Sequence, residues 1–337
     1  MKKRLSKFFS ILFISLFFVG CGSKEIKKYE DSRFLFGTYI KIIIYDKDEN
    51  LAKISAEKAF QEIERIDEKF NSKVEGSIID KLNKSSEREI ILDEEGIKIF
   101  QEVKKIYELS DKKYDISIGP LLKLWGFTEE MIDSLQLKIP TKEEIEFTKV
   151  FVNYDKVKLE DDKLILESPI KEIDTGSFLK GYALSQAKKI LKNEGIKSAF
   201  ITSISSIDLI GTKPEAKPWK IGLQNPMLPS ELLGVVELKD KSLGVSGDYQ
   251  TYIEINGEMY HHIIDKESGY PVTDKKMVAV ISNDAFLADL YSTAFFLMPI
   301  DKVLDFVEKN EDLEVMIVDK DMEIIQSRNF KIEEIKK

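Results

Sequence analysis

The sequence has almost no cysteine and almost no histidine. Its 337 residues contain one cysteine, Cys21, and two histidines, His261 and His262. A chain with a single cysteine forms no internal disulfide, so disulfide bonds do not hold this fold together. Zinc sites in proteins are built from clustered His and Cys ligands. Because no second His or Cys cluster accompanies the adjacent histidines, we do not expect a zinc site.

Several other features are missing. The net charge of −9 argues against a nucleic-acid-binding surface. No G-x-G-x-x-G sequence opens a helix and no P-loop is present, so neither common nucleotide-binding motif applies. No run of like charge marks a disordered tail, and no Pro/Gly/Ser-rich linker divides the chain after its leader. With 43% hydrophobic and 33% charged residues, the composition is that of a globular protein, and we place one compact unit at residues 32–332.

The first 23 residues, MKKRLSKFFSILFISLFFVGCGS, differ from the rest of the chain. Basic residues precede an apolar run at 8–19 that is too short to cross a membrane readily as a helix. A basic start followed by a short apolar run is typical of a secretory signal. A lone cysteine directly after Val-Gly resembles the lipobox of bacterial lipoproteins, in which Cys21 would be lipidated and become the mature N-terminus. The alternative is an uncleaved anchor with an incidental cysteine. We expect a signal peptide over 1–20, a tether over 21–31, and a lipid-anchored protein on the extracytoplasmic face of a bacterial membrane.

The patterns in the remaining sequence predict helices between runs of hairpin-linked strands. FGTYIKIIIY (36–45) is rich in β-branched and aromatic residues and predicts a strand. Apolar residues at helical spacing predict helices over 51–70 and 94–109. Hairpins are expected in KVKLEDDKLILES, in TYIEINGEMYHHII, where Asn256-Gly257 suits a type I′ turn, and in LEVMIVDKDMEIIQS. This order predicts an α+β fold with antiparallel sheets and packed helices, not a doubly wound parallel sheet.

Two glycine-containing stretches stand out as candidate ligand sites. YDISIGPLLKLWGF (114–127) looks loop-like, and its glycines permit close approach of the backbone to a ligand. The alternative is a structured turn around a core tryptophan. EIDTGSFLKGYAL (172–184) carries Asp174 at a predicted strand end and starts a helix near Ser177. A helix start suits phosphate, and Lys180 adds a positive charge; the alternative is a capped helix with a solvated lysine.

The two histidines lie in a third stretch, SGDYQTYIEINGEMYHHIIDKESGYPV (246–272). Neighbouring strand residues face opposite sides. We therefore expect one of His261 and His262 to face a site and the other to be exposed. Histidine is the side chain best able to exchange a proton near neutral pH.

The fourth stretch, DLYSTAFFLM (289–298), places an acid in an apolar helix that Ser282 or Asn283 is expected to cap. Asp289 and Thr293 lie four residues apart and so share one helix face. A buried carboxylate is costly unless something pairs with it, and two oxygen ligands suit a hard cation such as Mg²⁺ or Ca²⁺. The alternative is that Thr293 bonds back into its own helix and a neighbouring loop caps Asp289.

Together, and in this order, these stretches resemble the FAD:protein FMN transferases of the ApbE type. The resemblance runs from FGT at Phe36 to the ADLYSTA helix, and it also includes FN…S…LN at 70–83. It implies a duplicated architecture related to the T-fold. Members are commonly exported lipoproteins that bind FAD and a divalent metal, usually Mg²⁺. They split the FAD pyrophosphate and attach FMN to a threonine of an acceptor protein, releasing AMP, although some hydrolyse FAD to FMN and AMP.

The resemblance also implies roles for single residues. It implies metal ligands at Asp289, Thr293 and Ser177, the last through its backbone oxygen, and a reactive histidine at His262. It implies flavin-nucleotide contacts at Phe36, Lys73, Tyr114, Asp115, Ile116, Asp174, Lys180 and Ile263. A cation on Asp289 would then offset the cost of burying this catalytic carboxylate, and His262 or a nearby carboxylate would take the proton of the threonine hydroxyl.

The sequence departs from the family pattern in several places. Lys73 stands where a tyrosine usually stacks on the flavin ring, and Ile204 and Ser205 replace a Gly-Gly pair. If backbone approaches the nucleotide there, we expect these side chains to crowd it. Ser185 replaces an aspartate, and Gln250 stands where an arginine is expected. Two alternatives therefore stay open: an FAD pyrophosphatase that uses no acceptor, and a non-catalytic flavin-binding lipoprotein.

Overall fold

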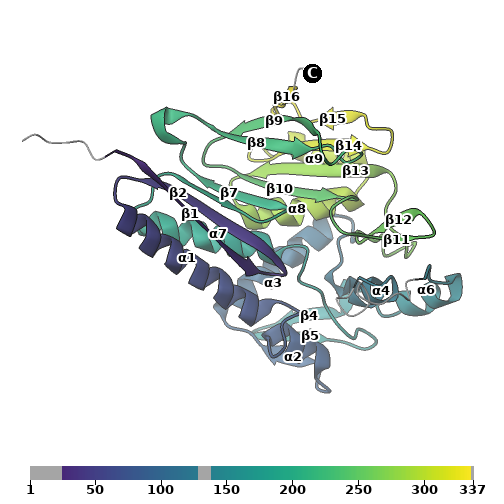
Figure 1. Ribbon diagram of the computed structural model, residues 1–337. Coiled ribbons are helices and arrows are strands. Elements are labelled where there is room, and N and C mark those ends of the chain that lie inside the picture. Colours follow the sequence, from purple (N-terminus) through teal and green to yellow (C-terminus); the bar gives the residue numbers. More distant parts are fainter. Residues whose placement is uncertain (1–24, 128–137, 335–337) are drawn as a thin grey trace, which may run out of the picture.

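The computed structural model describes residues 25–127 and 138–334, and the predicted signal peptide and Cys21 lie outside this part. Helices alternate with strands, and every strand pair in the described residues is antiparallel (Figure 1). The predicted α+β fold with antiparallel sheets is confirmed. Within the described ranges, no helix has the length and apolar character needed to cross a membrane.

An eight-stranded sheet forms the centre of the molecule. Its strands, in spatial order, are β1 (Lys27–Leu35), β2 (Thr38–Asp46), β6 (Ala199–Thr202), β7 (Ser206–Ile210), β10 (Ser242–Gly247), β13 (Lys275–Ser282), β14 (Glu314–Asp319) and β15 (Ile324–Gln326). In β2, Ile40, Ile42 and Ile44 are fully buried while the residues between them are less so, as the two-residue period of a strand requires. The predicted strand at 36–45 starts slightly later, because Phe36 and Gly37 form the turn after β1 with positive φ angles.

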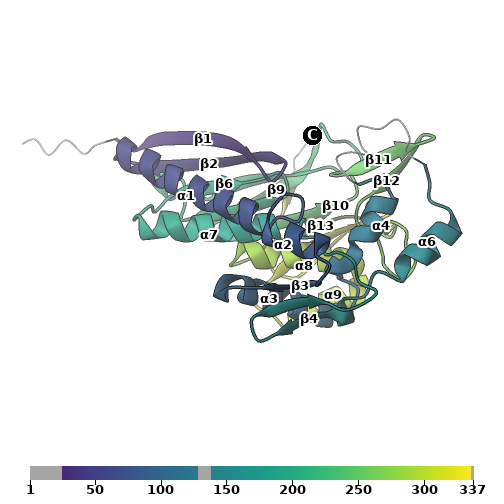
Figure 2. The same ribbon diagram turned by 90° about the horizontal axis from the view of Figure 1, so that it is seen from below.

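Three helices cover one face of this sheet (Figures 1 and 2). They are α1 (Glu49–Phe70), α7 (Leu179–Asn193) and α8 (Ala285–Leu297), with α7 in contact with both of the others. The Asp48 carboxylate caps α1 by accepting the N–H groups of Asn50 and Leu51. Further helices are α2 (Ile78–Lys84), α3 (Glu94–Leu109) and α9 (Ile300–Glu308). The helices predicted over 51–70 and 94–109 are therefore confirmed as α1 and α3.

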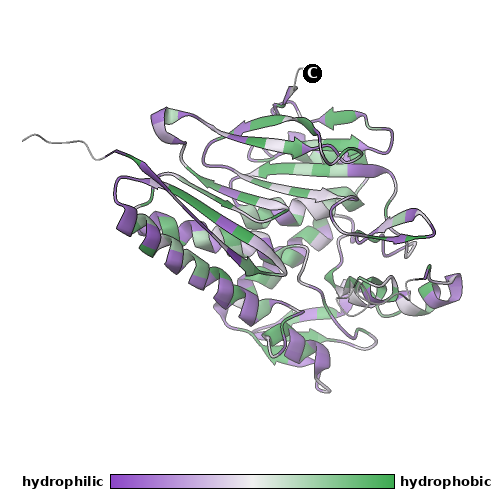
Figure 3. Ribbon diagram, in the orientation of Figure 1, coloured by the Kyte–Doolittle hydropathy of each residue, from purple (hydrophilic) through white to green (hydrophobic). Residues whose placement is uncertain are grey.

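A second layer of strands covers the opposite face of the central sheet. It contains β8 (Trp219–Gln224), β9 (Leu232–Leu238) and β16 (Glu333–Glu334). The buried Trp219 ring lies 5.9 Å from the ring of Tyr45 and 5.4 Å from that of Phe200, which joins the two layers. The central strands are largely hydrophobic because both of their faces are covered, whereas the outer side of α1 is mostly hydrophilic (Figure 3).

Smaller elements surround the end of the helical layer (Figures 1 and 2). They are the strands β3 (Glu89–Ile91), β4 (Val157–Glu160) and β5 (Lys163–Leu166), the helices α4 (Gly119–Leu124) and α6 (Lys142–Lys149), the hairpin of β11 (Tyr252–Ile255) and β12 (Glu258–His261), and the short turns η1 (Ile116–Ile118) and η2 (Tyr154–Lys156). A third short turn, η3 (Pro214–Ala216), lies in the connection between β7 and β8. The three predicted hairpins form as β4–β5, β11–β12 and β14–β15. Asn256 and Gly257 both have positive φ, as the predicted type I′ turn requires.

The predicted limits of the compact unit are wrong at both ends. Residues 27–31 do not belong to a tether, because they pair with β2 along the edge strand β1. At the other end, β16 pairs with β9 and extends the folded unit past the predicted limit of 332 to residue 334.

Three local predictions near the candidate stretches are also wrong. The segment expected to be loop-like, 114–127, contains η1 and α4, and Pro120 stands in the first turn of α4, where its missing N–H costs nothing. Asp174 does not end a strand, and α7 begins at Leu179, not near Ser177. The cap of α8 is Asp284, whose carboxylate accepts the N–H of Phe286, and not Ser282 or Asn283.

The Phe60 ring of α1 is fully buried. Replacing Phe60 with alanine should lower the free energy of unfolding by about 3–5 kcal/mol, because it removes apolar contact and leaves a cavity. Phe147→Ala is the matched control, since the same side chain is 69% exposed there, and should cost about 1 kcal/mol or less. Urea denaturation measures the free energy of unfolding of both variants. Equal losses of this free energy would contradict the assignment of Phe60 to the core.

Candidate functional site

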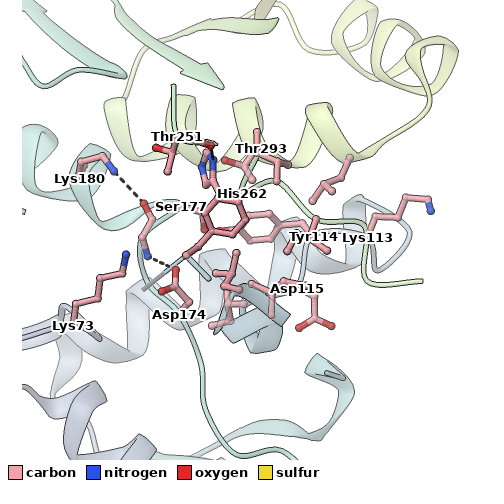
Figure 4. A pocket seen from close by; sticks show the side chains of 18 residues that line it. Lys73, Lys113, Tyr114, Asp115, Asp174, Ser177, Lys180, Thr251, His262 and Thr293 are labelled. Carbon is pink, nitrogen blue, oxygen red and sulfur yellow. Dashed lines mark hydrogen bonds between the residues drawn. The ribbon is translucent and has the colours of Figure 1, made fainter. Parts of the chain in front are cut away.

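One pocket brings together residues from all four chemistry-bearing stretches (Figure 4). The predicted site residues that line it are Lys73, Tyr114, Asp115, Ile116, Asp174, Ser177, Lys180, His262, Ile263 and Thr293. The structure thus gathers side chains that lie up to 220 positions apart in the chain, from Lys73 to Thr293. Their individual roles stay predictions.

Other lining residues had no predicted role. They are Lys113, Ile118, Leu122, Phe127, Gly176, Thr251, Ile264 and Leu297. All except Lys113 lie inside the stretches quoted above, so the sequence located the segments. It did not show which side chains of a helix or loop point inward, because that depends on how α4 and the β11–β12 hairpin pack.

Two predicted site residues lie outside the pocket lining. Phe36 sits in the turn between β1 and β2, where its N–H donates to Asp67 Oδ2 at 2.8 Å, so its implied nucleotide contact is not made in this pocket. Asp289 is 5% exposed and lies behind the pocket wall, next to Gly181 in the first turn of α7.

The Asp289 carboxylate is held by two groups from other elements. Its Oδ2 accepts the N–H of Gly181 at 2.7 Å, and the Ser206 hydroxyl lies 2.6 Å from Oδ1 and 2.8 Å from Oδ2. A Cβ atom at position 181 would lie 2.3 Å from the carbonyl oxygen of Ala285 and 2.7 Å from the carboxylate carbon. Only glycine therefore lets α7 and α8 approach closely enough for this contact.

Protein groups offset part of the cost of burying Asp289. Burial raises the pKa of this carboxyl to about 6, while the positive charge of Lys180 and the hydrogen bonds from Ser206 and Gly181 oppose the rise. The helix dipole of α7 also favours an anion at this end. A cation is thus not the sole compensation. The groups that hold Asp289 belong to helix α7 and strand β7, and not to a neighbouring loop as the alternative stated. That alternative fails for Thr293, whose hydroxyl lies 3.2 Å from Ser246 Oγ in β10 and does not bond back into α8.

The oxygen atoms around Asp289 fit a hard cation. A carboxylate oxygen has two lone pairs, and among residues 25–127 and 138–334 only the Ser206 hydroxyl donates to Oδ1. Thr293 lines the pocket one helical turn further along α8, and Ser177 lines it from the segment before α7. Mg²⁺ prefers such oxygen ligands, with only one or two carboxylates. In the described ranges, no group of three or more His, Cys, Asp or Glu side chains is arranged to hold a metal.

The two histidines have different environments. His261 is 6% exposed and buried against Phe296, so the prediction that the second histidine is exposed is wrong. Both of its ring nitrogens are used, since Nε2 lies 2.6 Å from the Val272 carbonyl and Nδ1 accepts the Ile263 N–H. His262 lines the pocket, and its Nδ1 lies 3.1 Å from the Thr251 carbonyl oxygen.

This contact fixes the proton position on His262. A carbonyl oxygen only accepts, so Nδ1 must carry the hydrogen and Nε2 keeps a free lone pair. Burial lowers the pKa of His262 to about 4, and the positive charges of Lys180 and Lys73 add to the decrease. The imidazole is therefore neutral near pH 7 and has one nitrogen available to accept a proton.

Two lysine side chains approach the same side of the pocket (Figure 4). Lys180 Nζ donates to the Gly176 carbonyl oxygen at 3.2 Å. Burial lowers the pKa of Lys180, while the negative charges of Asp289 and Asp174 oppose this. Lys73 lines the pocket from the segment after α1. This side of the pocket is suited to an anionic group.

Two other lining residues are bound by the protein itself. The buried Tyr114 hydroxyl lies 2.8 Å from Ser177 Oγ, and burial raises its pKa. Asp115 uses both oxygens within the fold: Oδ1 accepts from Ser117, and Oδ2 accepts from the Tyr154 N–H and from Lys266 Nζ. Asp115 therefore braces the pocket wall, and any nucleotide contact competes with these bonds.

The expected crowding at the missing Gly-Gly pair is not found in this pocket. Ile204 is 76% exposed, and neither Ile204 nor Ser205 lines the pocket. Ser185, which replaces the usual aspartate, donates to the Asp284 carboxylate at 2.8 Å and thereby joins α7 to the start of α8.

Comparisons with known proteins agree with this arrangement. The model of the ApbE family matches residues 36–317. The FAD:protein FMN transferase of Klebsiella pneumoniae is 27% identical over 306 residues, covering 89% of this chain and 92% of that protein. The FAD:protein FMN transferase of Haemophilus influenzae is 27% identical over 325 residues, covering 92% of this chain and 91% of that protein.

Solved structures of ApbE proteins also superpose on this chain over most of its length. The crystal structure of the ApbE protein from Thermotoga maritima superposes with a TM-score of 0.82 at 31% identity, over 90% of this chain and 98% of that one. The flavin transferase ApbE from Vibrio cholerae has a TM-score of 0.80 at 20% identity, which supports the fold alone; it covers 91% of this chain and 99% of that one.

The environment of His262 predicts an unusual titration. Its imidazole should titrate near pH 4 and not near the ordinary value of about 6.5. Because the unfolded state then binds the proton more tightly, the His262 contribution to the free energy of unfolding is present above about pH 6.5 and is lost as the pH falls toward about 4. NMR titration of the two imidazoles, assigned with His261→Gln, measures this, and a His262 pKa of 6.5 or higher would contradict the neutral state of this half-buried imidazole.

Proposed function

The chain belongs to the ApbE family, and from this we propose that it is an FAD:protein FMN transferase. In this proposal it splits the pyrophosphate of FAD and attaches FMN to a threonine of an acceptor protein, releasing AMP. The names of its relatives support the activity. The observation that carries the proposal is the pocket in which Lys73, Lys180 and His262 face one space beside Thr293 and the buried Asp289.

The proposed reaction transfers a phosphoryl group. The threonine oxygen attacks the phosphorus of the FMN half, a new P–O bond forms, and the bond to the bridging oxygen breaks so that AMP leaves. Such reactions depend mainly on alignment and on positive charge near the phosphate oxygens. Lys73 and Lys180 supply fixed charge and orient the diphosphate.

We propose that Mg²⁺ is held by Asp289, Thr293 and the backbone oxygen of Ser177. When bound, this ion neutralises negative charge on the phosphate oxygens. Asp289 contributes the one carboxylate, and the Gly181 N–H and Ser206 hydroxyl keep it in place.

We propose that His262 accepts the proton of the threonine hydroxyl through Nε2. Thr251 holds the ring through Nδ1 and leaves Nε2 free. A pKa of about 4 makes a weak base. The negative diphosphate of bound FAD raises this pKa toward neutrality, because a nearby opposite charge favours the protonated imidazole.

We propose further that the protein is exported and lipid-anchored through Cys21, on the extracytoplasmic face of a bacterial membrane. The basis is the leader sequence, with its basic start, short apolar run and Val-Gly-Cys end. The acceptor would then be a protein whose target threonine lies on the same side of the membrane.

One feature favours a second candidate, an FAD pyrophosphatase. Lys73 lines the pocket at the position where the family resemblance implies a stacking tyrosine. A lysine stem covers a flavin ring less completely than an aromatic ring does. A less firmly held flavin would admit water in place of the acceptor hydroxyl. Release of AMP from FAD without acceptor would identify this activity, and intact bound FAD with no AMP would identify binding alone.

Incubation with FAD, Mg²⁺ and a candidate acceptor should add one FMN to the acceptor, measured by mass spectrometry and in-gel flavin fluorescence. Asp289→Ala should lower the rate at least about 100-fold, because it removes the only carboxylate of the proposed metal site. Asp301→Ala is the control and should leave the rate unchanged, since Asp301 is exposed on α9. Full labelling by Asp289→Ala would show that the metal site is wrongly assigned.

A further inference from the structure

The Ser206 side chain is the main constraint on the orientation of the Asp289 carboxylate. Ser206 opens β7, is fully buried, and faces α8. Its hydroxyl lies within hydrogen-bond distance of both carboxylate oxygens, at 2.6 Å and 2.8 Å. Within the described part of the chain, it is the only side chain that donates a hydrogen bond to the Asp289 carboxylate, and the other donor to this carboxylate is the backbone N–H of Gly181.

These two donors fix how the carboxylate is turned. A serine hydroxyl has one proton to give, and the Gly181 N–H is directed at Oδ2. Rotation of the carboxylate would break one of the two bonds. Oδ1 therefore keeps a lone pair in a set direction, as a cation ligand requires. Groups that hold a metal ligand in this way commonly control the affinity of the site.

Ser206 is itself held rigidly. Its N–H donates to Ser203 Oγ at 3.2 Å, and its carbonyl oxygen accepts the Ser203 N–H at 2.9 Å. The next strand supports the same turn, since the Val245 N–H donates to the Ser205 carbonyl oxygen at 2.8 Å. The hydroxyl thus enters the Asp289 site from a fixed backbone, while Ile204 at the tip of the turn stays exposed.

The chain contains a close structural parallel outside the pocket. Ser242 in β10 is also fully buried, and its hydroxyl donates to the buried Asp208 carboxylate at 2.7 Å. Lys188 pairs with that same carboxylate at 2.6 Å. Neither Ser242 nor Asp208 lines the pocket. Removing the Ser242 hydroxyl therefore makes the same chemical change at a site with no proposed role in catalysis.

From this geometry we infer that Ser206 is a positioning residue that orients Asp289 for cation binding. The inference rests on the proposed function, because it takes Asp289 as a metal ligand. It adds a residue to which neither the family resemblance nor the sequence patterns gave a role. Ser206 does not touch the substrate in this account and acts only through Asp289.

The test measures metal affinity without catalysis. Mn²⁺ is titrated into the wild-type protein and its variants, with free Mn²⁺ followed by electron paramagnetic resonance and Mg²⁺ used as competitor. Ser206→Ala should raise the Mn²⁺ Kd about 10- to 100-fold, as is typical when a group behind a metal ligand is lost. Ser206→Thr, which keeps the hydroxyl and suits a strand, should stay within about threefold of wild type. Ser242→Ala should leave the Kd unchanged.

The outcomes separate this inference from the proposed function. If Asp289→Ala abolishes Mn²⁺ binding and Ser206→Ala binds like wild type, the metal site stands and the role of Ser206 is overturned. If Asp289→Ala also binds like wild type, the metal assignment fails, and the inference fails with it. Thermal melting of Ser206→Ala and Ser242→Ala compares their stabilities. An equal rise in Kd for both would show that general loosening of the fold is responsible and would also overturn the inference.

Discussion

A carboxylate buried in an apolar helix is stable only where other groups hold it, and the arrangement of this molecule depends on how Asp289 is held. Three elements meet at this side chain: α8 carries it, the first turn of α7 donates the Gly181 N–H, and β7 contributes the Ser206 hydroxyl. The contact requires α7 and α8 to lie very close together, which only a glycine at position 181 permits. The contact between Gly181 and Asp289 therefore determines both how closely α7 and α8 pack and where a negative charge lies beside the pocket.

The same constraint places the other groups of the site. Because Asp289 is fixed behind the start of α7, Lys180 is kept close to its charge, and Thr293 faces the pocket one helical turn further along α8. His262 also lines the pocket, and its contact with Thr251 leaves one ring nitrogen free. His262 and two lysines line one pocket, and the fixed acid Asp289 lies behind its wall. This arrangement suits the proposed phosphoryl transfer, in which alignment and charge matter more than covalent chemistry.

Much of this could be predicted from the sequence, and the errors have identifiable causes. Helical spacing of apolar residues located α1 and α3, and Asn256-Gly257 located a turn, because these signals are local. The strand at 27–31 was missed because KKYED has no apolar run, and its pairing with β2 is a contact that no local pattern indicates. The buried state of His261 depends on Phe296, which is 35 positions away. Ser206 was not recognised for the same reason, since nothing near it in the sequence indicates a carboxylate 83 residues further on.

The most direct test of the account is a crystal structure of the protein with FAD and Mg²⁺. The account predicts one cation with an Asp289 carboxylate oxygen and Thr293 Oγ1 each about 2.0–2.1 Å away, and with a diphosphate oxygen of FAD among its other ligands. A cation bound elsewhere, or a diphosphate lying away from these two side chains, would contradict it.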